Sequence, residues 1–119
     1  MVSPLLQAQT PRDKILSVFD SLAETAARPN YHGCAFQRAG AEAGAGSSVK
    51  RICDDSRAWL RGQFTELARE AGVPDPQAFG GQLALIYDGA AMMAYLDEDP
   101  SAPGAARAVA EQLLSQMSK

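Results

Sequence analysis

The sequence predicts an all-α fold of about five helices, packed as an orthogonal or antiparallel bundle. Two observations lead to this expectation. Long intervals without proline carry apolar residues at spacings of three and four, and no segment alternates apolar and polar residues over the length of a strand. The seven prolines separate these intervals, because a proline inside a helix removes a hydrogen bond and clashes with the preceding turn. With 119 residues, 46% of them hydrophobic, residues 1–119 are expected to form a single domain.

The first two helices are expected before residue 44. Thr10 is a suitable N-cap, with Pro11 in the first turn and Asp13 near the positive end of the helix dipole. The apolar face of this helix comprises Ile15, Val18, Phe19, Leu22 and Ala26. A short helix is expected over GCAFQRAGAE, residues 33–42, and the glycines and serines that follow it end the element.

Three further helices are expected after residue 48. The longest covers residues 49–71, with Gly72 as a left-handed C-terminal cap. Asp75 and Pro76 open the next helix, which extends to Leu96 and has Asp88 as its only charged residue. The last helix is expected over residues 105–117 and is rich in alanine, which allows a partner helix to approach closely.

The composition excludes several classes of function. The formal net charge is −3 and the basic residues are scattered, so the chain lacks the basic surface of a nucleic-acid-binding protein. No apolar run reaches the roughly 18 residues of a membrane span, and the N-terminus lacks the pattern of a secretory signal. We therefore expect a cytoplasmic protein with no membrane contact.

Candidate chemistry is confined to YHGC, where His32 lies two residues before Cys34. Zinc sites need three or four ligands, and the chain has one histidine and two cysteines, so a metal would have to recruit carboxylates. Residues i and i+2 of an extended segment point to opposite sides, which argues against a paired nucleophile and base. We expect no catalytic residue, no metal, no cofactor and no enzymatic activity.

Aromatic side chains are spread over the first four expected helices and either fill a core or line a ligand cavity. If a cavity exists, its ligand should be small and largely apolar, because the aromatic and methionine stripes offer few charges. The residues expected to line it are Phe19, Phe36, Trp59, Phe64 and Tyr87.

Three stretches together resemble the C-terminal domain of TetR-type transcriptional regulators. They are YHGCAFQRAGAE, the turn LAREAGVPDP, and QLALIYDGAAMMAYLDEDP followed by an alanine-rich helix. The resemblance extends from about residue 10 to residue 117. It implies an effector-sensing and dimerisation domain, in which the YHGC entry is structural. Such regulators bind DNA through an N-terminal helix-turn-helix, which is absent from these 119 residues, so any contact with DNA would depend on a part outside this chain.

The resemblance also implies a homodimer joined by the last two helices of each subunit. The residues themselves agree, because the helix that ends at Leu96 is apolar around much of its circumference and a small bundle cannot cover all of it. An alternative function is a short interaction module that pairs with full-length regulators and inhibits them. The expected interface residues are Leu83, Ile86, Ala90, Met93, Ala94, Val109 and Leu113.

Overall fold

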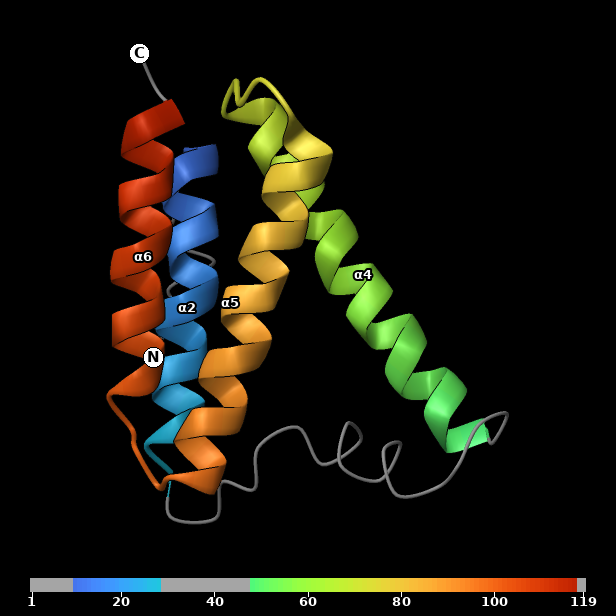
Figure 1. Cartoon of the computed structure of the whole chain (residues 1–119), viewed down its shortest axis with the longest axis vertical. Helices are drawn as coiled ribbons and strands as arrows, with labels where there is room; N and C mark the ends of the chain where they lie inside the picture. Colours follow the sequence, from blue (N-terminus) through green and yellow to red (C-terminus); the bar gives the residue numbers. More distant parts are fainter. Residues whose placement is uncertain (1–9, 29–47, 118–119) are drawn as a thin grey trace.

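The computed structural model describes residues 10–28 and 48–117, and these residues form four helices and no strand (Figure 1). They are α2 (Pro11–Ala26), α4 (Ser48–Glu70), α5 (Pro76–Leu96) and α6 (Ala102–Met117). The all-α class is therefore confirmed. The short helix expected over residues 33–42, which would bring the number to five, lies outside the described residues.

The helices run alternately up and down. α2 and α6 lie side by side and antiparallel, α5 is antiparallel to α6, and α4 leans away from α5 toward its own N-terminal end (Figure 1). Within the described part of the chain, α2 contacts each of the other three helices, whereas α4 contacts α2 and α5 but not α6. One end of α4 is thus held by the bundle, and the other end extends beyond it.

Local sequence signals account for both ends of the α4–α5 connection. Gly72 has a φ of +85°, in the left-handed region that favours glycine. Its N–H donates to the Arg69 carbonyl at 3.1 Å, and the Val73 N–H donates to the Ala68 carbonyl at 3.1 Å, which is the Schellman arrangement. Asp75 then caps α5, because its Oδ1 accepts from the Ala78 N–H at 3.2 Å. Both predicted signals are confirmed.

The starts of α2 and α6 differ in how well they were predicted. Thr10 caps α2 as expected, with its hydroxyl oxygen accepting from the Asp13 N–H at 3.0 Å. The last helix begins at Ala102, three residues before the predicted start at residue 105. Pro103 lies in its first turn, where an N–H would have no partner within the helix in any case, so this proline does not delay the helix.

Glycine allows α4 and α5 to cross closely. A Cβ placed on Gly80 would lie 2.3 Å from the Thr65 hydroxyl oxygen and 2.8 Å from the Thr65 Cα. No other residue type fits at this position without a shift of the helices. The two helices therefore meet at Thr65 and Gly80 and diverge toward the N-terminal end of α4 (Figure 1).

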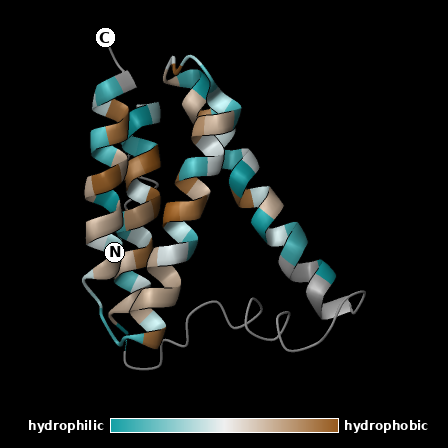
Figure 2. Ribbon diagram, in the orientation of Figure 1, coloured by the Kyte–Doolittle hydropathy of each residue, from teal (hydrophilic) through white to brown (hydrophobic). Residues whose placement is uncertain are grey.

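The core lies where α2, α5, α6 and the C-terminal half of α4 meet. Figure 2 shows the difference in hydropathy: α5 is largely apolar, whereas hydrophilic positions are frequent along α4. The side chains that are fully buried and largest by volume are Phe19, Phe64, Phe79, Ile15, Leu83, Leu114 and Pro103.

Candidate functional site

Three of the predicted pocket residues meet in the core. Phe19 of α2 and Phe64 of α4 stack with their ring centroids 5.8 Å apart. Tyr87 of α5 meets both rings edge-on, at 6.0 Å from Phe19 and 6.3 Å from Phe64. These separations are those of rings in direct contact, and both phenylalanines are fully buried. Among the described residues, the three rings therefore pack against one another and fill the space between the helices.

The other two predicted pocket residues do not join this cluster. Trp59 is 67% exposed, because it lies on the opposite side of α4 from Phe64: five residues along a helix correspond to a rotation of about 140°. Phe36 lies outside the described residues. The structure thus brings together the pocket residues of three helices and places the tryptophan on the outside.

The predicted dimer residues fall into three groups by exposure. Leu83, Ala90 and Ala94 are buried within their own chain, so they are not available to form a surface. Ile86 and Leu113 are half-buried. The exposed members are Met93, which is 52% exposed, and Val109, which is 45% exposed.

Two exposed apolar residues were not among those predicted. Leu85 is 74% exposed and Leu96 is 67% exposed. Both lie on the side of α5 opposite the buried Leu83 and Ala94. The sequence contained a sign of this second apolar side. Leu85 and Leu96 lie outside the main apolar face of a helix that has a single charge, and such a pattern indicates that the helix is covered on more than one side.

The few charges of α5 and α6 are directed away from this side. Arg107 of α6 pairs with Asp20 of α2 at 2.9 Å and with Glu111 one turn further along α6 at 3.3 Å. Asp88 of α5 pairs with Arg57 of α4 at 3.7 Å. These three, Asp88, Arg107 and Glu111, are the only charged residues of the two helices.

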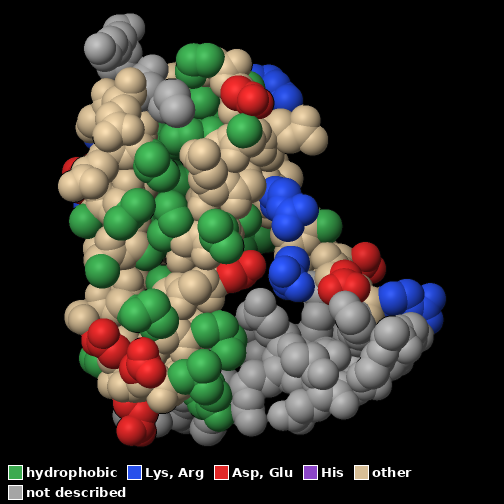
Figure 3. Space-filling view, in the orientation of Figure 1, with side chains coloured by type: hydrophobic (Ala, Val, Ile, Leu, Met, Phe, Trp, Pro, Cys, Tyr) green, Lys and Arg blue, Asp and Glu red, His purple; other side chains and the backbone are tan. Residues whose placement is uncertain are grey.

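The exposed residues on this side of α5 and α6 are uncharged, and we call this set of residues the outer face. Figure 3 shows hydrophobic side chains over the α5–α6 part of the molecule, with acidic groups at its lower end, another near its top, and a further acidic group next to the basic groups beside α4. The outer face consists of the exposed residues Gln82, Leu85, Gly89, Met93 and Leu96 of α5 and Ala105, Ala108, Val109 and Gln112 of α6.

A second, charged feature lies between α4 and α5. One side of α4 faces α5 and carries residues at the spacing i, i+4, i+7 and i+11. These residues are Arg57, Arg61, Phe64 and Ala68. Burial raises the pKa of the Asp88 carboxyl above its ordinary value of 3.8, and the positive charges of Arg57 and Arg61 act in the opposite direction. The inner side of α4 is therefore apolar in its C-terminal half and basic further toward its N-terminus.

A solved structure shares this arrangement of helices. It is the crystal structure of a TetR-family transcriptional regulator from Streptomyces coelicolor, with a TM-score of 0.86 and 24% sequence identity. No known protein-family profile matches the sequence, and no curated protein matches it at a significant level. The chain has a TetR-type fold.

The match covers 98% of this chain and 62% of the regulator's chain, so this chain spans less than two thirds of the length of the protein it is similar to. Over that shared part, the TetR-type fold agrees with the resemblance in the sequence. The dimer interface and the effector pocket that the resemblance implies stay predictions.

Neither a metal site nor a membrane span is found among the described residues. His32 and Cys34 lie outside the described residues. Residues 10–28 and 48–117 contain no group of three histidine, cysteine, aspartate or glutamate side chains placed to hold a metal ion. Among the same residues, no helix of this TetR-type fold is long and apolar enough to cross a bilayer.

Proposed function

We propose that this chain is the effector-sensing and dimerisation domain of a TetR-type transcriptional regulator, and that it forms a homodimer through the outer face. The observation that carries the proposal is an uncharged, partly apolar surface on the two helices that such regulators use for pairing, in a chain with a TetR-type fold. Contiguous apolar surface on a small protein is a common mark of a protein interface.

The chemistry of the outer face suits a symmetric four-helix contact. Leu85, Leu96 and Val109 supply apolar area, while Gly89 has no neighbouring atom within 4 Å of an added Cβ and so leaves room for a partner helix. The glutamines can exchange hydrogen bonds across a twofold axis without placing a charge in the contact. Both partners of a C2 dimer use the same patch, and an uncharged patch meets its own copy without electrostatic repulsion.

The sensing part of the proposal concerns α4. Its C-terminal half packs in the core beside α2 and α5, and its N-terminal half leans away from them (Figure 1). A ligand that binds α4 and α5 differently in two arrangements would shift the population between them. Because α5 also carries the outer face, such a shift would reach the dimer.

Sedimentation of the Leu85→Asp variant tests the dimer. A carboxylate buried in an apolar contact without a partner would weaken dimerisation on the order of 100-fold or more, while the protomer should keep its helix content because Leu85 is exposed in the isolated chain. The matched control is Ala58→Asp, which places the same charge on an exposed position of α4. A wild-type chain that is monomeric at every concentration, or equal dimerisation of the two variants, would contradict the proposal.

A further inference from the structure

The exposed residues of α5 between positions 82 and 96 are arranged symmetrically about Gly89. Leu85 and Met93 lie four residues before and after Gly89, and Gln82 and Leu96 lie seven residues before and after it. At about 100° of rotation per residue, all four lie within about 40° of Gly89 around the helix. We call these five residues the α5 stripe. Each of its residues before Gly89 has a counterpart at the same distance after it.

The two long edges of the α5 stripe differ in charge. Asp88 lies about 100° around the helix from Gly89 and pairs with Arg57 of α4 at 3.7 Å, which marks the α4 side. Among the described residues, α6 contacts α5 but not α4, so it borders the stripe on the other side (Figure 1). The exposed residues of α6 that belong to the outer face, Ala105, Val109 and Gln112 among them, are uncharged. The stripe therefore has an uncharged edge and a charged edge.

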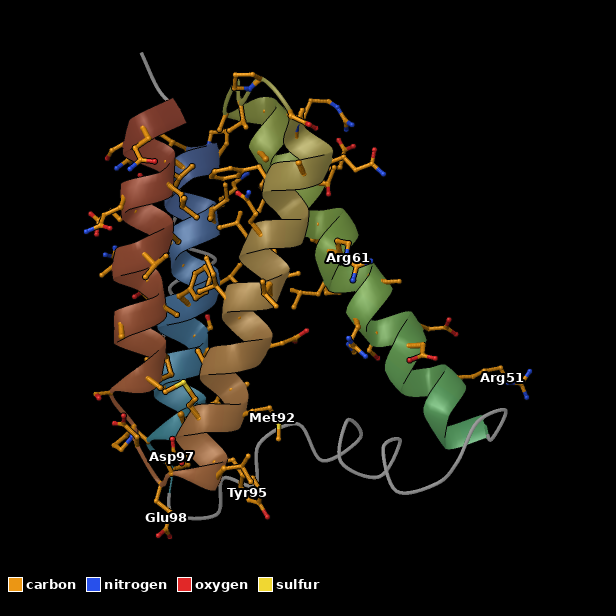
Figure 4. The ribbon with its side chains drawn as sticks, in the orientation of Figure 1. Arg51, Arg61, Met92, Tyr95, Asp97 and Glu98 are labelled. Atoms are coloured by element: carbon orange, nitrogen blue, oxygen red, sulfur yellow. The ribbon has the colours of Figure 1, made fainter. Side chains whose placement is uncertain are left out.

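The two ends of α5 also differ in charge. Asp97, Glu98 and Asp99 follow its last turn, and Figure 4 shows Asp97 and Glu98 at this lower end of the bundle. At the other end, the first turn has no acidic residue beyond the cap Asp75. The unpaired N–H groups of a helix start carry a partial positive charge. One end of α5 is thus acidic, and the other end favours a negative partner.

Two copies can bring this stripe face to face about a twofold axis in two ways. An axis along α5 makes the two helices parallel, places α6 of one copy over α4 of the other, and brings both acidic ends together, where like charges repel. An axis across α5 makes the helices antiparallel. The uncharged edges then meet each other, and the acidic end of each copy lies near the start of the partner helix. The charges therefore favour the antiparallel arrangement.

We propose that the partner of the α5 stripe is a second copy of this chain, antiparallel, with the twofold axis at Gly89. Leu85 then packs beside the partner's Met93, and Gln82 beside the partner's Leu96. The inference rests on the proposed dimer and adds its orientation and register.

A glycine suits the position at the axis, because only there does a residue meet its own copy. Packed helix axes are about 8–10 Å apart and a Cα lies about 2.3 Å from its axis, so the two facing Cα atoms come within about 3.4–5.4 Å. This gap has little room for two further side chains. In the protomer, a Cβ added to Gly89 meets no atom within 4 Å, so the space beside it is open to a partner.

Disulfide formation between introduced cysteines tests the orientation, in a chain whose Cys34 and Cys53 are replaced by serine. A disulfide needs Cα atoms about 4.4–6.8 Å apart. In the antiparallel dimer, position 85 of one copy lies beside position 93 of the other, whereas the two copies of position 85 are about 12 Å apart along the helices. A mixture of Leu85→Cys and Met93→Cys chains should therefore form linked dimers on mild oxidation, and each variant alone should stay unlinked.

The matched control mixes Leu85→Cys with Ala58→Cys, because Ala58 is exposed on α4. This mixture should stay unlinked. Linking of Leu85→Cys with itself, or no more linking in the test mixture than in the control, would overturn the proposed orientation.

A charge pair tests the register with both native cysteines in place. Positions 82 and 96 are about 21 Å apart along one helix, well beyond the screening length of about 8 Å at physiological salt. The charges of Gln82→Lys and Leu96→Glu therefore cannot interact within one chain, but in the proposed dimer they meet across the contact. Sedimentation should show the double variant dimerising at least roughly threefold more tightly than the two single effects predict together, because two exposed ion pairs contribute about that much.

The control for the charge pair is Gln82→Lys with Leu96→Lys, which should dimerise less tightly than the single effects predict. Strictly additive effects in both double variants would overturn the register. The same sedimentation runs separate this failure from that of the proposed function. A dimer with additive charges or with self-linked Leu85→Cys rejects only the antiparallel contact at Gly89, whereas a wild-type chain that stays monomeric rejects the dimer itself.

Discussion

The two sides of α5 differ in what covers them, although both are apolar. On one side, Leu83, Ala90 and Ala94 are buried against α2, α4 and α6. On the other side, Leu85 and Leu96 are exposed. The helix carries one charge in 21 residues, and that charge faces α4.

The difference shows that one copy of this fold uses only part of its apolar surface. The buried side stabilises the protomer, and the exposed side has the composition of a surface that is covered in an assembly. Substitutions on the two sides should therefore change different quantities. Substitutions on the buried side should change the free energy of unfolding of the protomer. Substitutions on the outer face should change the association of two protomers.

The largest expected difference in stability is between two truncations on opposite sides of α5, at Leu83 and at Leu85. Leu83→Ala should lower the free energy of unfolding by about 2–5 kcal/mol, because it removes a fully buried side chain and leaves a cavity. Leu85→Ala should change it by no more than about 0.5 kcal/mol in the dissociated protomer. Urea unfolding at several protein concentrations measures both, since only the effect of Leu85→Ala should depend on concentration. Equal losses at high dilution would contradict the division of α5 into two sides.

Two glycines of α5 give the next largest contrast. Gly80→Ala should destabilise the protomer by about 1–3 kcal/mol, because the new Cβ overlaps Thr65 at the crossing with α4. Gly89→Ala should stabilise the isolated protomer by about 1 kcal/mol through helix propensity, since the added methyl group meets no atom within 4 Å.

In the proposed dimer, the methyl group of Gly89→Ala would instead meet the partner helix and weaken association. Thermal unfolding and sedimentation of both glycine variants distinguish these outcomes. A stabilised Gly80→Ala chain would show that α4 and α5 do not cross as closely as the structure has them.

The ion pair between α2 and α6 should contribute less. Arg107→Ala removes the contacts with Asp20 and Glu111, and all three side chains are between about one third and one half exposed. Pairs at such exposure contribute about 0–1 kcal/mol, less at high salt. Unfolding of Arg107→Ala beside Arg69→Ala, whose pair with Glu66 lies within α4 alone, should show the larger loss for Arg107. Equal losses would mean that the ion pair between Arg107 and Asp20 adds nothing to the stability of the chain.

The smallest effect concerns the protonation of Asp88. Because the pKa of its carboxyl is raised in the folded chain, the folded state binds more protons than the unfolded state above pH 3.8. The associated stabilisation is complete below that pH and is lost as the pH rises through the folded pKa. The free energy of unfolding of the wild-type chain, relative to Asp88→Asn, should therefore fall as the pH rises above 3.8. A difference that is constant with pH would show that this carboxyl titrates as it does in the unfolded chain.

The positions of the helices followed from the sequence because short-range contacts set them. The caps at Thr10 and Asp75 and the left-handed turn at Gly72 depend on hydrogen bonds and backbone sterics within a few residues. The start of α6 was predicted three residues late, because Pro103 gave the appearance of a break but fits the first turn.

The sequence did not predict which side of each helix packs against the core and which side is exposed. Trp59 and Phe64 both belong to the apolar residues of α4, and spacing alone does not say which of them meets the core. The same holds for Leu83 and Leu85, and for the arginines that face α5. Local rules fix where a helix begins and ends because their interactions span a few residues. Which side is covered depends on helices distant in sequence, so the tertiary structure alone decided it.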